Sequence, residues 1–208
     1  MEYKSMRKET ECRLTFDNHM NKNVIDALIK KRELMEKLGK DAVINCDMDG
    51  VLAEWEVGCT YEKTWEPHYF LYRDLEVVVR DTLLLLMAAG FKCQAASAAY
   101  EEGTARADKD AWLNKNGLEN LPRIFMPCGK NKADFIDIKD NITYILLDDY
   151  SLNLHNWEAT ARGTAKFVAI KFLNGINGNS GDWKGRTLHH HSSAEILAHS
   201  LADIAVMS

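Results

Sequence analysis

The sequence predicts an α/β fold with a parallel sheet flanked by helices, and three features indicate it. Short apolar segments alternate with segments of helical periodicity along most of the chain. The apolar runs "YILL" and "FVAI" are nearly continuous, which is typical of strands covered on both faces. Several helical segments end at a glycine. Strands separated by helices pair in parallel through right-handed crossovers, and 208 residues suit one compact domain.

The elements are expected in a regular order. Residues 1–40 should contain an N-terminal arm (1–20) and an amphipathic helix (23–38), and residues 41–208 should form the main domain. We expect strands over 42–46, 91–97, 123–127, 143–149 and 166–170. We expect further helices over 74–89, 104–116, 132–136, 151–161 and 194–207. The last helix should open at Ser192-Ser-Ala-Glu195, which matches a capping box.

The composition argues against several classes of function. A net charge of −5 gives no electrostatic reason to bind a nucleic-acid duplex or an anionic membrane. The longest apolar run, "LLLLMAAG", is far shorter than the ~20 residues that span a bilayer. The N-terminus lacks the apolar core of a signal peptide, and the five cysteines contain no Cys-x-x-Cys pair. A cytoplasmic protein with reduced thiols is therefore expected.

Conspicuous polar residues follow the predicted strands. Asp47 and Asp49 come directly after the first strand, Ser97 ends the second, and Asp148 and Asp149 end the fourth. Ligands of parallel α/β sheets bind beyond the carboxyl ends of the strands, so these side chains should meet at one edge. Helix capping or solvation accounts for most single aspartates, but it does not account for four of them at two strand ends.

These residue types suit phosphoryl transfer. An aspartate at a strand end can attack phosphorus, and a second carboxylate two residues later can protonate the leaving oxygen and then activate water. The Asp148-Asp149 pair offers hard oxygen ligands for Mg²⁺. The hydroxyl of Ser97, together with Lys130 or Lys132 at the start of a short helix, offers partners for phosphate oxygens.

A calcium loop is the competing interpretation. Counting from Asn45, the residues Asn45, Asp47 and Asp49 occupy positions one, three and five, with Gly50 at six and Glu56 at twelve. Such a loop needs a helix running into position one, whereas "AVINC" is typical of a strand. The context therefore favours phosphoryl transfer, and a noncatalytic or calcium-binding module is the alternative from a different class.

Taken in order, these motifs resemble a known superfamily. "DMDGV" at Asp47, then Ser97, Lys132 and the pair Asp148-Asp149, are similar in order and spacing to the four motifs of haloacid dehalogenase superfamily phosphatases. "DMDGVLAEW", "DKDAWLNK" and "LLDDYSLNLHNWE" resemble the 5′(3′)-deoxyribonucleotidase branch in particular. The likeness covers roughly residues 43–186.

This resemblance implies roles for the site residues. Asp47 would be the nucleophile and Asp49 the acid/base. Mg²⁺ would be held by Asp47, the backbone carbonyl of Asp49 and Asp148, and Asp149 would orient these ligands without touching the ion. Ser97 and Lys132 would bind phosphate, because the branch pattern favours Lys132 over Lys130.

The resemblance also implies a Rossmann-like domain over 41–208 with a small cap inserted after the first strand, at about 51–73. Six aromatic residues fall in this insertion: Trp55, Tyr61, Trp65, Tyr69, Phe70 and Tyr72. Most should pack the cap onto the domain, and Trp65 is the candidate for stacking on a nucleobase. The expected substrate is a (deoxy)nucleoside monophosphate, and another small phosphate monoester is the second enzymatic possibility.

Overall fold

Six parallel strands organise the chain. The computed structural model describes residues 22–177 and 181–208. Its strands are β1 (Asp41–Cys46), β2 (Lys92–Ala98), β3 (Arg123–Met126), β4 (Ile142–Asp148), β5 (Lys166–Leu173) and β6 (Arg186–His189). Their spatial order is β3-β2-β1-β4-β5-β6, and every neighbouring pair runs parallel. The predicted Rossmann-like sheet is confirmed.

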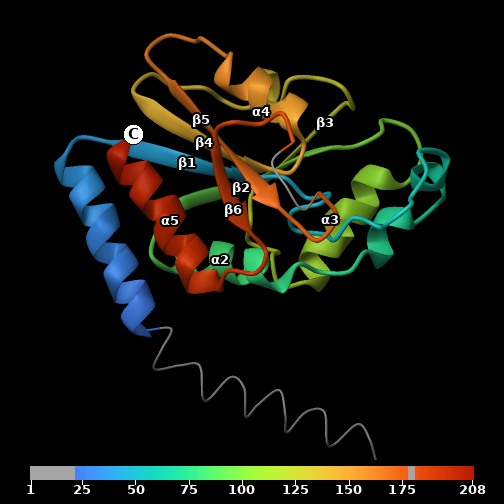
Figure 1. Ribbon diagram of the computed structural model, residues 1–208, viewed down its shortest axis with the longest axis horizontal. Helices are drawn as coiled ribbons and strands as arrows, with labels where there is room; N and C mark the ends of the chain where they lie inside the picture. The colour runs from blue at the N-terminus through green and yellow to red at the C-terminus, as the bar shows by residue number, and fades with distance from the viewer. Residues whose placement is uncertain (1–21, 178–180) are drawn as a thin grey trace, which may run out of the picture.

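Helices cover both faces of this sheet. They are the N-terminal helix (residues 22–37), α2 (Val77–Ala88), α3 (Ala105–Lys115), α4 (Ser151–Glu158) and α5 (Ala194–Met207), with the short 3₁₀ helices η1 (Glu62–Trp65), η2 (Tyr69–Tyr72) and η3 (Lys132–Phe135). Figure 1 shows α4 on the opposite side of the sheet from α2 and α5. The chain crosses the sheet in one direction from β1 through β2 to β3, and in the other direction from β4 through β5 to β6. Because the crossovers are right-handed, the helices between the strands of these two halves lie on opposite faces.

Each face has its own apolar core. The larger core lies under α2, α3 and α5, and residues such as Ile44, Leu86 and Leu201 are fully buried in it. The smaller core lies under α4, where Trp157 is fully buried and donates its Nε1–H to the carbonyl of Tyr144. Continuous apolar runs in β4 and β5 therefore reflect burial from both sides.

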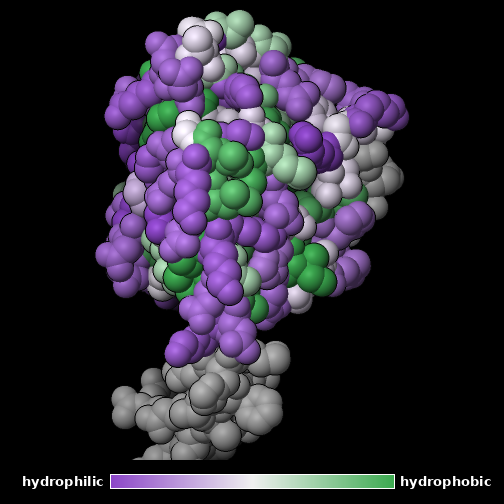
Figure 2. All heavy atoms as spheres, turned by 90° about the vertical axis from the view of Figure 1, so that its left-hand side faces the viewer, coloured by the Kyte–Doolittle hydropathy of each residue, from purple (hydrophilic) through white to green (hydrophobic). Residues whose placement is uncertain are grey.

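The N-terminal helix belongs to the larger core. Its Leu28 is fully buried, and its Lys31 forms an ion pair with Asp203 of α5 at 2.5 Å. Figure 2 shows this side of the molecule, where hydrophilic side chains predominate around smaller hydrophobic groups. The arm predicted for residues 1–20 lies outside the described residues. In the described part of the chain, no helix combines the length and the hydropathy needed to cross a membrane.

Three element predictions needed correction. The strand β6 was not expected, because "RTLH" is short and lacks an apolar pattern. α2 begins at Val77 instead of residue 74, because Leu75 forms a β-bridge with Ala53 before the helix can start. The N-cap of α5 is Ser193, one residue later than the capping-box pattern indicated, and its side chain accepts a hydrogen bond from the backbone N–H of Ile196.

The cap segment, residues 51–73, leaves the sheet after β1 and returns beside its own start. The bridge between Ala53 and Leu75 holds the two ends together, and the backbone N–H of Glu54 donates to the carbonyl of Asp74 at 2.9 Å. Between these ends, η2 lies against α3 and η1 packs on η2, and Figure 1 shows this part of the chain beside α3. The first residues of the insertion also line a cavity together with the residues that follow β5 and β6.

Candidate functional site

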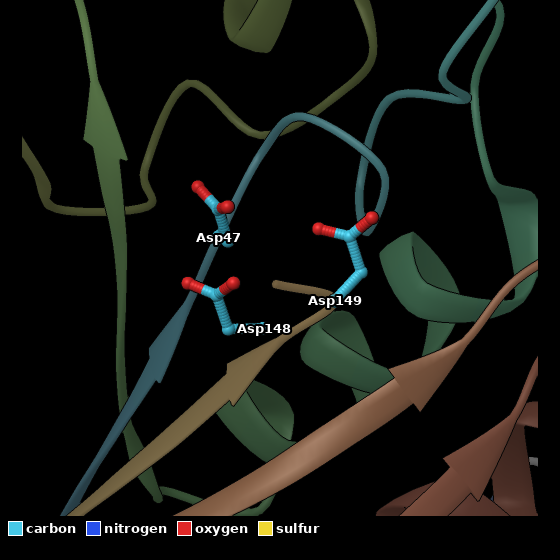
Figure 3. Close-up of side chains that lie close together, drawn as sticks. All are labelled: Asp47, Asp148 and Asp149. Atoms are coloured by element: carbon cyan, nitrogen blue, oxygen red, sulfur yellow. The ribbon is translucent and has the colours of Figure 1, made fainter. Parts of the chain in front are cut away.

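The site begins where the chain changes direction across the sheet. β1 and β4 are neighbours, β1 is followed by a crossover toward β2, and β4 is followed by one toward β5. Crevices at such switch points are where parallel α/β sheets bind ligands. Cys46 pairs with Leu147, so Asp47 and Asp148 come next on adjacent strands. Figure 3 shows these two carboxylates side by side.

A third carboxylate completes an acidic cluster. One oxygen from each of Asp47, Asp148 and Asp149 lies within 4.8 Å of the others. Asp148 is fully buried, and its two oxygens accept from the side-chain amide of Asn153 at 3.2 and 3.0 Å. The backbone N–H of Tyr150 donates to the same carboxylate at 2.9 Å. Fixed carboxylate oxygens at this spacing are the ligands that a hard divalent cation such as Mg²⁺ prefers.

Burial makes negative charge unfavourable in this cluster. Burial raises the pKa of Asp148 to about 6, Asp47 adds to the rise, and Lys132 opposes it. Burial raises the pKa of Asp149 well above its ordinary value, with further contributions from Asp148 and Asp47. A divalent cation would compensate for this buried charge, so the donor set fits the predicted metal.

Asp149 lies closer to the cluster than the resemblance implied. Its carboxylate is turned toward the loop that follows Asp47, as Figure 3 shows. A Cβ on Gly50 would lie 2.6 Å from the Cγ of Asp149, and Gly50 has a φ of +79°. Asn174 donates to the carbonyl of Gly50 at 2.7 Å and to Asp149 at 3.1 Å. Glycine at position 50 therefore makes room for the third carboxylate.

Lys132 is the lysine that reaches the cluster. Its Nζ lies 2.8 Å from an oxygen of Asp47 and 2.8 Å from an oxygen of Asp148, and it donates to the carbonyl of Ala96 at 2.7 Å. Burial alone would lower the pKa of Lys132, but Asp148 and Asp47 raise it, so the ammonium stays charged. Lys130, the other candidate, is exposed.

Asp49 is held by a different lysine, Lys109 of α3, which the sequence analysis did not identify. The Nζ of Lys109 forms an ion pair with Asp49 and donates to Ser97 Oγ at 3.0 Å and to the carbonyl of Ala98 at 2.5 Å. Burial raises the pKa of Asp49, and Lys109 opposes the rise. One signal was available: Lys109 lies four residues after Ala105, on the buried face of its helix.

Ser97 lies deeper than a phosphate contact was expected to lie. It is fully buried in β2, and its hydroxyl accepts a hydrogen bond from Lys109 and donates one to the carbonyl of Ala98. The structure therefore brings Ser97 to the same edge as Asp49, linked to it through the ammonium of Lys109.

The cap segment forms a small cleft next to this edge. Trp65 is 55% exposed and stacks on Tyr100 with ring centroids 4.7 Å apart, and Tyr61 meets both rings edge-on. A cavity of about 180 Å³ is lined by Trp65, Tyr100 and Phe70 among others. The ring of Phe70 lies 4.4 Å from the Nζ of Lys109. Phe70 therefore lines this aromatic cleft and also contacts the lysine that pairs with Asp49.

A larger cavity, of about 310 Å³, lies between the loop that follows Asp47 and the residues that follow β5. It is lined by Gly50 and Asn174, and also by Glu54 and Glu76. Burial and the charge of Glu54 raise the pKa of Glu76. These two carboxylates would oppose a phosphate dianion in the larger cavity, as Glu66 and Glu102 would in the smaller one, so charge alone does not distinguish the two cavities.

The geometry at β1 argues against a calcium loop. Asn45, which would be the first ligand, is fully buried and donates to the carbonyls of Val43 and Ile145 at 3.2 and 3.1 Å. Glu56, the twelfth position, is paired with Lys63 and Arg73. A strand, not a helix, runs into the segment.

Searches of protein-family models, curated proteins and solved structures returned no match to this chain. Assignment of function therefore depends on the chemistry of the site.

Proposed function

We propose that this protein is a Mg²⁺-dependent phosphomonoesterase that hydrolyses a (deoxy)nucleoside monophosphate through an aspartyl-phosphate intermediate. One observation carries the proposal: each member of the Asp47–Asp49 pair has its own buried lysine. Lys132 contacts Asp47, and Lys109 contacts Asp49. Two adjacent carboxylates in different fixed environments are suited to two different chemical roles.

In the first step, an oxygen of Asp47 forms a bond to phosphorus while the bond from phosphorus to the leaving oxygen breaks. The leaving oxygen takes the electron pair and the proton of the Asp49 carboxyl group, and the nucleoside departs as an alcohol. In the second step, Asp49 accepts a proton from water, whose oxygen attacks phosphorus. The bond between phosphorus and Asp47 breaks, inorganic phosphate leaves, and both carboxyl groups return to their starting states.

The charges of the site suit a phosphate only when a cation is bound. Asp47, Asp148 and the backbone carbonyl of Asp49 would hold Mg²⁺, which when bound would neutralise charge on the phosphate oxygens. Lys132 supplies a fixed positive charge beside Asp47. Asp149 is held by Asn174 and would keep the metal ligands in place.

The preference for a nucleotide rests on the aromatic cleft of the cap segment. Trp65 has one face against Tyr100 and remains more than half exposed, so a flat base could still contact it. Stacking of a base on an aromatic side chain is worth about 1–3 kcal/mol. A cavity of about 180 Å³ suits a monophosphate with one flat ring system better than a large ligand.

The test is turnover of a panel of deoxynucleotides, ribonucleotides, sugar phosphates and p-nitrophenyl phosphate, with Mg²⁺ or with excess chelator. We expect monophosphates of nucleosides to be the best substrates and chelator to abolish turnover. Asp47→Asn should lower kcat/KM by at least about 10⁴-fold, because the amide cannot act as the nucleophile. Acid quenching of the wild-type protein should trap a phosphorylated aspartate.

The matched control is Asp41→Asn. Asp41 lies at the opposite end of the same strand, where it pairs with Lys92 at the surface. It should leave turnover unchanged. Near-normal activity of Asp47→Asn, or full activity in chelator, would contradict the mechanism. A panel in which sugar phosphates outrun every nucleotide would instead favour a phosphatase of another small metabolite.

A further inference from the structure

Lys109 is a buried ammonium group for which the four-motif resemblance has no role. Its side chain is 1% exposed, and its partners are Asp49, Ser97 and the carbonyl of Ala98. Removing an ammonium from water carries a large desolvation cost, which these three oxygens offset. Trp112 and Leu113, which follow Lys109 on the same helix, are buried in the larger apolar core.

Stability alone gives a weak reason for this arrangement. Replacing a buried ion pair by apolar side chains of similar volume is often neutral or stabilising. The ring of Phe70 already lies over the Nζ of Lys109, so an apolar side chain would find an apolar neighbour there. A charged group at this position is better explained by what it does to Asp49.

The two buried lysines divide the carboxylates between them. Lys132 bridges Asp47 and Asp148, so it is not available to Asp49. Lys109 is fixed to β2 through Ser97 and Ala98 and contacts one carboxyl oxygen of Asp49, so it can hold the Asp49 side chain in place.

We propose that Lys109 is a positioning residue that fixes the Asp49 carboxyl group for proton transfer to the leaving oxygen. This inference rests on the proposed function. Lys109 itself would contact neither the phosphorus nor the leaving group. It acts by keeping the proton donor in place while the bond between phosphorus and the leaving oxygen breaks.

The position of Lys109 is in turn tied to the cap segment. The preceding residue, Asp108, is buried, accepts from Thr104 Oγ1 at 2.7 Å and pairs with His68 Nδ1 at 3.1 Å. The backbone N–H of His68 donates to the same threonine hydroxyl at 2.9 Å. These contacts join the cap segment to the first turn of α3. The position of the cap segment and the orientation of the Lys109 side chain therefore depend on the same hydrogen bonds.

The leaving group provides the test. A nucleoside alkoxide must be protonated as it departs, whereas p-nitrophenolate leaves without a proton. We expect Lys109→Met to slow single-turnover release of nucleoside from a deoxynucleoside monophosphate by about 10²-fold or more, the size of a general-acid contribution. Release of p-nitrophenol from p-nitrophenyl phosphate should change by less than about 5-fold, since that step does not use the proton.

The control is Lys115→Met on the same helix, whose ammonium lies over the exposed Tyr72 ring. It should change neither rate. Equal losses on both esters with Lys109→Met would show a structural role and overturn this inference while leaving the phosphatase assignment intact. A wild-type protein that hydrolyses neither ester would overturn the proposed function as well.

A second comparison covers the case in which Lys109→Met does not fold. Asp49→Asn and the double variant Asp49→Asn/Lys109→Met leave no carboxylate unpaired at this position. If Lys109 acts through Asp49, the two variants should show the same ratio of nucleotide to aryl ester rates. A further drop of that ratio in the double variant would mean that Lys109 acts on the substrate by another route and would overturn the inference.

Discussion

Gly50→Ala should damage both the fold and the acidic cluster, and the structure gives the size of each effect. The residue has a φ of +79°, in the region that costs a non-glycine residue about 1–2 kcal/mol. The added Cβ would also lie 2.6 Å from the Cγ of Asp149, where no atom can remain. Asp149 must then move, which breaks its hydrogen bond from Asn174.

Gly117→Ala separates these two contributions. Gly117 has a similar φ of +76°, but a Cβ there would meet nothing within 4 Å. We therefore expect Gly117→Ala to lose only the backbone part, about 1–2 kcal/mol, or roughly 2–8 °C in Tm for a domain of this size. Gly50→Ala should lose at least about 1 kcal/mol more through the broken hydrogen bond, and it alone should weaken Mg²⁺ binding.

Thermal unfolding of both variants with and without Mg²⁺ gives the measurement. Mg²⁺ should raise the Tm of the wild-type protein and of Gly117→Ala by similar amounts, because a ligand that binds only the folded state stabilises it by mass action. It should raise the Tm of Gly50→Ala much less. Equal Tm losses and equal Mg²⁺ shifts in the two variants would refute the assigned place of Asp149 beside Gly50.

Two further predictions concern the metal and the cap. Burial raises the pKa of Asp148 to about 6, above its unfolded value, so this group stabilises the metal-free fold below about pH 4 and that contribution is lost as pH rises through 6. Mg²⁺ must displace the same proton, so its apparent Kd by calorimetry should rise as pH falls from 7 to 5, and a pH-independent Kd would contradict the site. Trp65→Ala should raise KM for nucleotides by a factor equivalent to about 1–3 kcal/mol and change p-nitrophenyl phosphate turnover far less. Tyr72→Ala, another exposed cap aromatic, is its control, and equal losses on both substrates would mean that Trp65 only packs the cap.

The fold was predictable because each central strand carries its own signal. "AVINC" and "YILL" are apolar and flanked by helical periodicity, so β1 and β4 could be placed, and parallel pairing follows from the helices between them. β6 could not be placed, because an edge strand has one neighbour and its residues are only partly buried. Because these side chains are only partly buried, the segment shows no run of apolar residues that would predict a strand.

The positions of the candidate site residues could be predicted where those residues directly follow a strand. Asp47 and Asp148 meet because their strands are adjacent, which any parallel sheet with this order must produce. Lys109 could not be assigned a partner in the same way, because it reaches Asp49 from a helix sixty residues away along the chain. Only the packing angle of α3 decides where such a long side chain ends.

The charges of these residues favour a bound cation at the proposed site. In the described part of the chain, Lys132 pairs with Asp47 and Asp148, and Lys109 pairs with Asp49. When all three are ionised, Asp47, Asp148 and Asp149 exceed the charge of Lys132 by two, and burial raises the pKa of both Asp148 and Asp149. One divalent cation would offset that excess and allow these carboxylates to ionise. A phosphate dianion can then approach Asp47 without facing net negative charge, so metal binding should precede productive substrate binding.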